Sequence, residues 1–227
     1  MKRISSLLCG AVALTLAAGS ANAAVFTYGL NEEFTGGTPP VSAVQPWVSV
    51  SFEDDAGNPG SVLLTISNVN LTVPENMAAF AFNVLLPNGF AENNISITQV
   101  AKVGTFDTPT LDYSPNVGAS LDFDLGLDFT TGGVANKVFG AQEIEQLLIS
   151  STDGALLAAY FDVTTVKNED GPYHVAAHIQ NTGGPTAGDS GWIGDGPGFP
   201  NTGETPEPAS LGLLALGAVG LLARRRK

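Results

Sequence analysis

The sequence predicts an all-β protein whose folded part is a single antiparallel β-sandwich, jelly-roll-like in type. Short runs of residues alternate between apolar and polar with the period of a strand, and they recur along most of the chain. Clusters of Gly, Pro, Asn and Asp separate these runs, as turns between short strands do. Hydrophobic residues make up 44% of the chain, which argues against disorder across the folded part.

The first half of the folded part contains a predicted hairpin. Residues 25–28 are expected to form the first strand, and residues 32–44, which include two Gly and two Pro, a loop. Residues 47–52 and 61–73 both alternate, and residues 54–60 between them are a dense turn segment of Asp, Gly, Asn and Pro. We therefore predict that these two runs pair as antiparallel strands.

The second half contains further candidate strands. They are residues 80–86, 95–103, 121–129, 156–166 and 173–180. Residues 121–129 alternate most regularly, with apolar side chains on one face and Asp122, Asp124 and Asp128 on the other. Residues 141–149 fit a helical period as well as a strand, and the sequence leaves both interpretations open.

The N-terminus has the three parts of a secretory signal peptide. Two cations follow Met1, residues 4–18 are apolar, and Ala21-Asn22-Ala23 is an A-x-A cleavage site. Residues 1–23 are therefore expected to be removed, so that the mature chain begins at Ala24. Cys9, the only cysteine, leaves with this segment. The mature chain then has no thiol for a disulfide, a nucleophile or a zinc site.

The C-terminal end shows a second ordered set of features. Residues 24–180 are predicted to form the sandwich and residues 181–205, rich in Gly, Pro and Thr, a flexible stalk. Residues 190–195 include Trp192 and are the one part of the stalk that could dock on the sandwich. Fifteen uncharged residues, 209–223, then precede a run of four cations. This segment is short for a bilayer, which needs roughly 20 apolar residues, although arginine side chains can extend it.

The order of these C-terminal features resembles the PEP-CTERM sorting signal of Gram-negative bacteria. The residues that carry the resemblance are Pro206, Glu207 and Pro208, the apolar segment, and Arg224, Arg225 and Arg226. Thr205 stands where such signals commonly have Val. The resemblance covers residues 206–227, and an ordinary tail anchor is the alternative interpretation.

The resemblance also implies a route for the protein. It implies export by the secretion machinery, transient anchoring in the inner membrane by a transmembrane sorting helix, and processing by an exosortase. The mature protein would then lie at the cell surface or in the extracellular matrix. Association with biofilm and exopolysaccharide is implied by the likeness alone.

Between its two ends the chain is strongly acidic. Residues 24–205 contain three lysines, no arginine and 21 carboxylates, which gives a net charge of −18. Such a surface repels nucleic acid and suits a protein that stays dispersed or holds divalent cations. The candidate calcium ligands are Asp54 and Asp55 in a turn and Asp122, Asp124 and Asp128 on a strand. The alternatives are an ordinary turn and a solvated sheet face, and no other cofactor is expected.

The sequence contains no recognisable catalytic constellation. It lacks a G-x-S-x-G elbow, a phosphate-binding loop, a dinucleotide fingerprint and an H-E-x-x-H motif. His174 and His178 would lie roughly 13 Å apart along one face of a strand, too far to share a zinc ion directly. We therefore expect a protein that is not an enzyme, with a secreted hydrolase as the least favoured hypothesis.

Two further features leave a binding function open. Trp47, Tyr113, Tyr173 and Trp192 could form a platform on which sugar rings stack. The alternative function is therefore a carbohydrate-binding β-sandwich module, with or without calcium. Asn94 is the acceptor in an acidic-x-Asn-x-Ser glycosylation sequon, for which an unmodified turn is the alternative interpretation.

Overall fold

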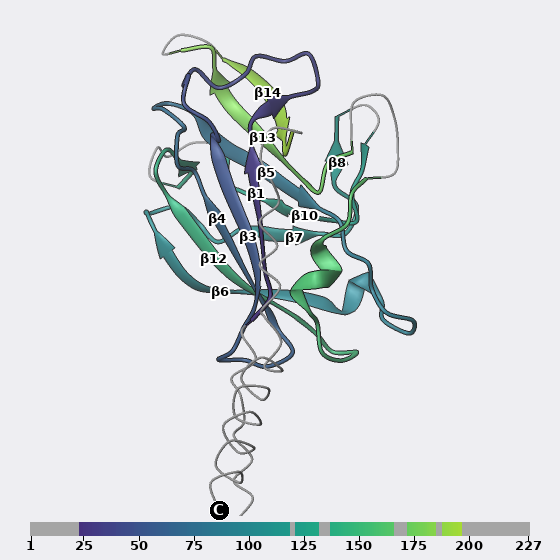
Figure 1. The fold of residues 1–227 in the computed structure, drawn as a ribbon. Coiled ribbons are helices and arrows are strands. Elements are labelled where there is room, and N and C mark those ends of the chain that lie inside the picture. Colours follow the sequence, from purple (N-terminus) through teal and green to yellow (C-terminus); the bar gives the residue numbers. More distant parts are fainter. Residues whose placement is uncertain (1–22, 119–120, 132–136, 166–171, 185–187, 197–227) are drawn as a thin grey trace, which may run out of the picture. The chain divides into compact units, whose positions relative to one another are not determined.

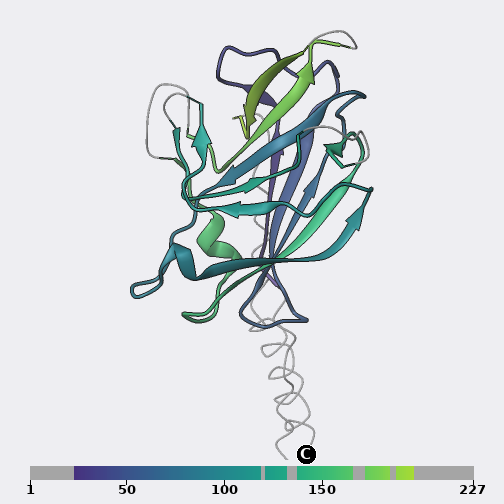
Figure 2. The same cartoon turned by 180° about the vertical axis from the view of Figure 1, so that it is seen from behind.

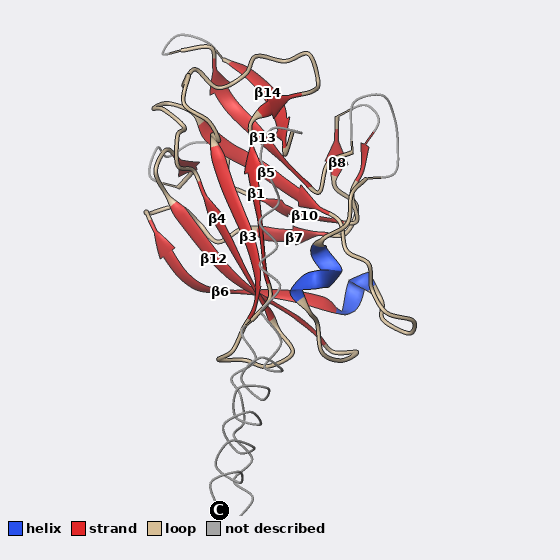
Figure 3. Cartoon of the chain, viewed as in Figure 1, coloured by secondary structure: helices blue, strands red, loops and turns tan. Residues whose placement is uncertain are grey.

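The computed structural model describes residues 23–118, 121–131, 137–165, 172–184 and 188–196. Strands account for 46% of the structure and helices for 4%, and the strands pair in antiparallel sheets (Figure 3). The prediction of an all-β sandwich is therefore confirmed. No helix within these ranges is long and apolar enough to cross a membrane. The predicted sorting helix lies outside the described residues.

One layer of the sandwich is a five-stranded antiparallel sheet (Figure 1). Its strands, in spatial order, are β1 (Val25–Leu30), β3 (Val48–Asp54), β4 (Val62–Ser67), β12 (Ile144–Ser151) and β6 (Ile95–Val103). The predicted hairpin is present, because β3 pairs with β4 from Asp54↔Val62 to Ser49↔Ser67. Residues 144–149 of the segment for which helix and strand were both open belong to β12, which lies between β4 and β6.

The second layer is a seven-stranded sheet, seen from the other side in Figure 2. Its main path is β2 (Glu32–Glu33), β14 (Asp189–Gly194), β13 (Val175–Thr182), β5 (Asn76–Phe82), β10 (Leu125–Asp128) and β7 (Thr110–Asp112), with β11 (Phe139–Gly140) pairing β5 beside that path. A small two-stranded sheet is formed by β8 (Asn116–Val117) and β9 (Leu121–Asp122). Two 3-10 helices, η1 (Glu92–Asn94) and η2 (Ala158–Phe161), complete the described elements.

The main core lies between the two large sheets. The alternating strands place their buried residues in it, for example Val50 and Phe52 from β3 and Leu64 from β4. Phe82 from the facing sheet joins them, with its ring 5.6 Å from that of Phe52. Phe161 of η2 stacks on Phe52 at 4.9 Å and an interplanar angle of 9°. Burial of these large rings is a principal source of stability for a chain whose described part has no cysteine.

A second, smaller apolar cluster covers the outer face of the seven-stranded sheet. Its buried members are Ala81, Val117, Leu121, Phe123, Tyr173 and Ala176, with Phe34 and Trp192 packed against them. Ala81 and Ala176 belong to the sheet, while Val117 and Leu121 come from the β8–β9 hairpin. A Cβ on Gly126 of β10 would lie 2.7 Å from the Cβ of Pro115. The close approach of Pro115 to β10 therefore requires glycine at this position.

This second cluster explains why the prediction of one strand at residues 121–129 is wrong. The run divides into β9 and β10, which belong to different sheets. Leu121 and Phe123 are buried in the second cluster, whereas Leu125 enters the main core. Between them Asp124 accepts a hydrogen bond from the Val84 backbone N–H at 2.8 Å. Although residues 121–129 alternate regularly between apolar and polar, the chain passes from the second apolar cluster to the main core within this run.

Two other segments differ from the predictions. Residues 158–161, within an expected strand, form η2, because the Asp54 carboxylate accepts the Ala158 N–H at 2.6 Å and Phe161 packs in the core. The seven-stranded sheet continues beyond the expected boundary at residue 180. Strand β14 lies within the predicted stalk and pairs with β13, so the docking expected around Trp192 is present.

Candidate functional site

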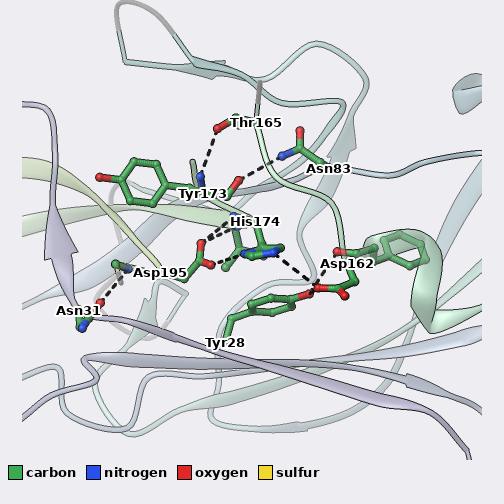
Figure 4. Close-up of polar contacts among 11 residues, drawn as sticks. Tyr28, Asn31, Asn83, Asp162, Thr165, Tyr173, His174 and Asp195 are labelled. Atoms are coloured by element: carbon green, nitrogen blue, oxygen red, sulfur yellow. Dashed lines mark hydrogen bonds and ion pairs between the residues drawn. The ribbon is translucent and has the colours of Figure 1, made fainter. Parts of the chain in front are cut away.

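A polar network centred on His174 joins the two layers (Figure 4). The His174 ring lies on that of Tyr28 from β1, with centroids 4.8 Å apart. Its Nδ1 is 2.6 Å from Oδ2 of Asp195, which directly follows β14, and its Nε2 is 3.5 Å from Oδ1 of Asp162, which follows η2. The Tyr28 hydroxyl donates to the same Asp162 oxygen at 3.0 Å. The segments that carry Tyr28, Asp162 and Asp195 thus all contact the imidazole ring of His174.

Backbone groups fix the position of Asp195 in this network. Its Oδ1 accepts the backbone N–H groups of His174 at 2.8 Å and Val175 at 3.1 Å. Burial, followed by the charge of Asp162, raises the pKa of Tyr28 far above its usual range, so this phenol is a permanent donor. The network therefore links β1 to the ends of β13 and β14 and can stabilise their packing.

An open pocket of about 570 Å³ lies on the surface near the second apolar cluster. Its lining residues are Glu92 of η1 and two stretches of chain, 113–118 and 121–124. Tyr113 is 41% exposed, and its hydroxyl donates to the Ile95 carbonyl at 2.9 Å, which fixes the direction of the ring. The volume falls in the range of small-molecule sites.

The pocket is acidic as well as aromatic. Glu92, Asp122 and Asp124 line it. Partial desolvation, and secondly the nearby Asp124 charge, raises the pKa of Glu92 above its usual range. An aromatic ring beside several hydrogen-bond acceptors can hold a polyol, because the ring face contacts C–H groups and the carboxylates accept O–H groups.

The candidate calcium ligands of the turn have other roles. Asp54 is bonded to the backbone of Ala158 and of Ala24, so both oxygens are occupied. Asp55 closes its own turn by accepting from Gly57 N–H and from the Asn58 side chain at 2.7 Å. The Asn58 bond, with the Gly57 bond second, holds the pKa of Asp55 below its usual range.

The three strand carboxylates are not brought to one continuous face. Asp122 is on β9 and Asp128 on β10, with Asp124 in the bend between them. Asp122 and Asp124 line the pocket and Asp128 does not. Partial burial, and secondly Asp112, raises the pKa of Asp128. Among the residues the structure describes, no group of three or more His, Cys, Asp or Glu is placed to hold a metal ion.

The predicted aromatic platform is divided between different places. Trp47 is buried in the main core and donates from Nε1 to the Ser42 carbonyl at 2.8 Å. Tyr173 and Trp192 belong to the second cluster, where Trp192 stacks on His178 at 5.1 Å. Burial lowers the pKa of His178. Tyr113 alone among the four lines the pocket.

The sequon asparagine is already engaged in a hydrogen bond. Nδ2 of Asn94 donates to both oxygens of Asp153, at 2.9 and 3.1 Å. A glycan on this nitrogen therefore requires that the Asp153 contact be given up. Of the predicted cleavage residues, Ala21 lies outside the described residues, whereas Ala23 and Ala24 lie at the start of them.

Comparison with known proteins adds one finding at the C-terminal end. The PEP-CTERM protein-sorting motif matches residues 204–227. The chain therefore carries this sorting motif at its C-terminal end. No curated protein and no solved structure matches the chain. The PEP-CTERM motif indicates an exported protein that is recognised by an exosortase and anchored in the membrane during transit.

The C-terminal sorting motif is easier to recognise in the sequence than the sites in the folded part. The matched segment includes the predicted sorting residues Pro206, Glu207, Pro208, Arg224, Arg225 and Arg226, all outside the described residues. Sequence reasoning missed the network around His174. Its members come from four separated segments, and only the pairing of β13 with β14 brings His174 to Asp195.

Proposed function

We propose that this PEP-CTERM protein is cut by an exosortase and acts without catalysis at the cell surface or in the extracellular matrix. The observation that carries the proposal is the sorting motif at residues 204–227. On this proposal the helix anchors the chain in the inner membrane only until the cut, and the acidic sandwich is the part delivered outside. Exopolysaccharide of the biofilm matrix is the partner that we propose for it.

Two features support a role without catalysis. The His174 imidazole lies between two carboxylates, with Asp195 2.6 Å from Nδ1 and Asp162 3.5 Å from Nε2, as in a structural ion-pair network. The net charge of −18 between residues 24 and 205 suits a protein that stays dispersed among polysaccharide and does not bind nucleic acid.

The intact mass of the protein from its own host tests the sorting proposal. We expect a chain that begins at Ala24 and ends near Pro206, bare or with added sugar. The double variant Pro206→Ala/Pro208→Ala should keep its C-terminal residues, while Pro200→Ala, outside the matched segment, should be cut normally. A wild-type mass that extends to Lys227 would show that the tail is a plain anchor and would overturn the proposal.

Carbohydrate binding is a second candidate function, favoured by the pocket beside Tyr113. The observation that supports it is the combination of a fixed, exposed ring with Glu92, Asp122 and Asp124 in one pocket. Few cations lie among the described residues, so a neutral polysaccharide fits this surface better than an anionic one.

Thermal unfolding with the host's own extracellular polysaccharide tests this second function. A ligand at 100 times its Kd stabilises the folded state by about 2.7 kcal/mol, which gives a measurable rise in Tm. Tyr113→Ala should abolish the rise, and Tyr113→Phe should keep it because the ring remains. The titration is repeated with calcium and with a chelator to test the calcium dependence. No rise in the wild-type protein at saturating polysaccharide would reject carbohydrate binding and leave the sorting proposal untouched.

A further inference from the structure

Asp54 lies where the predicted start of the mature chain meets the sandwich. It is the last residue of β3, and its backbone N–H donates to the Ala24 carbonyl at 3.0 Å. Its side-chain Oδ2 is 3.3 Å from the Ala24 nitrogen, and its Oδ1 accepts the Ala158 N–H at 2.6 Å. The half-buried Asp54 carboxylate therefore connects the chain just before β1 with η2.

Removal of the signal peptide changes the chemistry of this contact. In the precursor the Ala24 nitrogen is a neutral amide with one N–H. Hydrolysis adds the hydroxyl of water to the Ala23 carbonyl and a proton to the Ala24 nitrogen, which becomes a primary amine. At neutral pH this amine takes up a further proton and carries three N–H donors and a positive charge, because an α-amino group ordinarily has a pKa of about 7.7–8.0.

We propose that the Asp54 carboxylate is the binding site for the α-ammonium group of the mature chain. Cleavage replaces the neutral amide donor of Ala24 by an ammonium group, so that the hydrogen bond to the Asp54 carboxylate becomes one between opposite charges and is strengthened. The pair holds the start of β1, an edge strand that pairs only with β3 in its sheet. The inference rests on the proposed export, since the signal peptide is removed during export.

The surroundings of Asp54 favour this pairing. Only two cationic side chains other than histidine lie among the described residues, and both have other contacts: Lys102 donates to the Phe106 carbonyl and Lys137 pairs with Asp107. The other titratable groups of the packed elements are Glu53, Asp55 and Tyr160, from β3, the following turn and η2. Nearby carboxylates stabilise the charged form of an amine and raise its pKa.

The ionisation of the α-amine tests the proposal directly. Full-length genes for the wild type, Asp54→Asn and Asp55→Asn are expressed in the native host, and the processed proteins are labelled by reductive ¹³C-methylation. NMR titration then gives the pKa of the Ala24 amine in each. We expect a pKa in Asp54→Asn lower than in the wild type by about one unit. Asp55→Asn, whose carboxylate closes a separate turn, should lower this pKa by much less than Asp54→Asn does, because only Asp54 contacts the Ala24 nitrogen in the described structure.

Each alternative outcome overturns the inference. Equal pKa values in the wild type and Asp54→Asn would show that the carboxylate does not hold the ammonium group. Should Asp54→Asn fail to fold, the comparison is between folded and urea-unfolded wild type, and a folded pKa that is not raised overturns the proposal. A mature chain that starts at another residue than Ala24 would also overturn the inference. The sorting proposal is decided separately, by the C-terminal residue that the intact mass gives.

Discussion

At the scale of single residues, the carboxylates of this protein mainly organise its own backbone. Asp124 accepts the Val84 N–H, Asp195 those of His174 and Val175, and Asp54 that of Ala158. The sequence showed that Asp is abundant in turns and beside strands. It could not show which backbone N–H groups lack a partner in the sheets, and those groups decide where each carboxylate lies.

Glu145 is the residue with the most marked acid–base consequence. It is fully buried on β12, and Gln99 Nε2 lies 3.0 and 2.8 Å from its two oxygens. Burial raises its pKa to about 7, against the opposing effects of the Gln99 hydrogen bonds and the Lys102 charge. A raised carboxyl pKa means that the folded state holds its proton more tightly than the unfolded state, so stability falls as pH rises from 4.5 to 7.

Replacing Glu145 by Gln should remove the loss of stability that the wild type shows as pH rises from 4.5 to 7. We expect Glu145→Gln to resemble the wild type at pH 5 and to be more stable at pH 8, by on the order of 2 kcal/mol. Urea unfolding at the two pH values measures the difference. Glu53→Gln, on β3 of the same sheet, is the matched control and is measured at the same two pH values. A constant difference between Glu145→Gln and the wild type at both pH values would contradict the raised pKa.

The Asp195 carboxylate should contribute to stability through His174. Asp195→Asn keeps one acceptor oxygen but replaces the oxygen that lies 2.6 Å from Nδ1, so we expect a loss of about 1–3 kcal/mol in the free energy of unfolding. Urea denaturation at pH 7 measures it. Asp189→Asn, at the exposed start of β14, is the control. An equal loss in both variants would show that the network around His174 has no special stabilising role.

At the scale of elements, alternation predicted the strands that have one buried face. Strands β3, β4 and β6 lie near the expected positions, and the buried side chains of each belong to the main core. For the segment that forms β12, the sequence pattern leaves helix and strand both open. Periodicity failed where a segment contributes to two clusters, as at β9 and β10, or where a core ring comes from a short helix, as at η2. Pairing between segments far apart in the sequence, such as β5 with β13, cannot be read from the periodicity of either segment.

The short helix η2 should be as important to the core as a strand. Phe161 is fully buried and contacts the rings of Phe52 and Phe82, at 4.9 and 5.8 Å. We expect Phe161→Ala to lower the free energy of unfolding by about 3–5 kcal/mol, because it leaves a cavity between the sheets. Leu157→Ala, at an exposed position immediately before η2, should cost less than about 0.5 kcal/mol. Similar losses measured by urea unfolding would contradict the packing described here.

At the scale of the whole molecule, charge dominates composition. The folded part carries 21 carboxylates between residues 24 and 205 against three lysines, and like charges repel within the compact state. We therefore expect the urea midpoint to rise as sodium chloride is added, since salt screens charges over about 10 Å at 0.1 M. Guanidinium chloride is unsuitable here because it is itself a salt. A midpoint that falls or stays constant with salt would contradict this.

For the whole molecule, a contiguous motif can be predicted from the sequence, whereas a site built from distant segments cannot. The sorting motif is a contiguous signal in residues 204–227 and can be recognised without a fold. The pocket and the network around His174 depend on which strands become neighbours. The acidic composition argued against a nucleic-acid partner but gave no information on where a ligand would lie.

The attachment of β14 also has a mechanical consequence. A load applied at Gly196, the last described residue, would act first on the contacts of Gly196 and Asp195. Two backbone donors and the His174 ring hold that carboxylate, and Gly196 N–H donates to the Asn31 side chain at 2.9 Å. Tension along the chain is therefore shared between both sheets before β14 can be peeled from β13. The C-terminal end of β14, the last described strand, is therefore the point at which the fold would resist a pulling force.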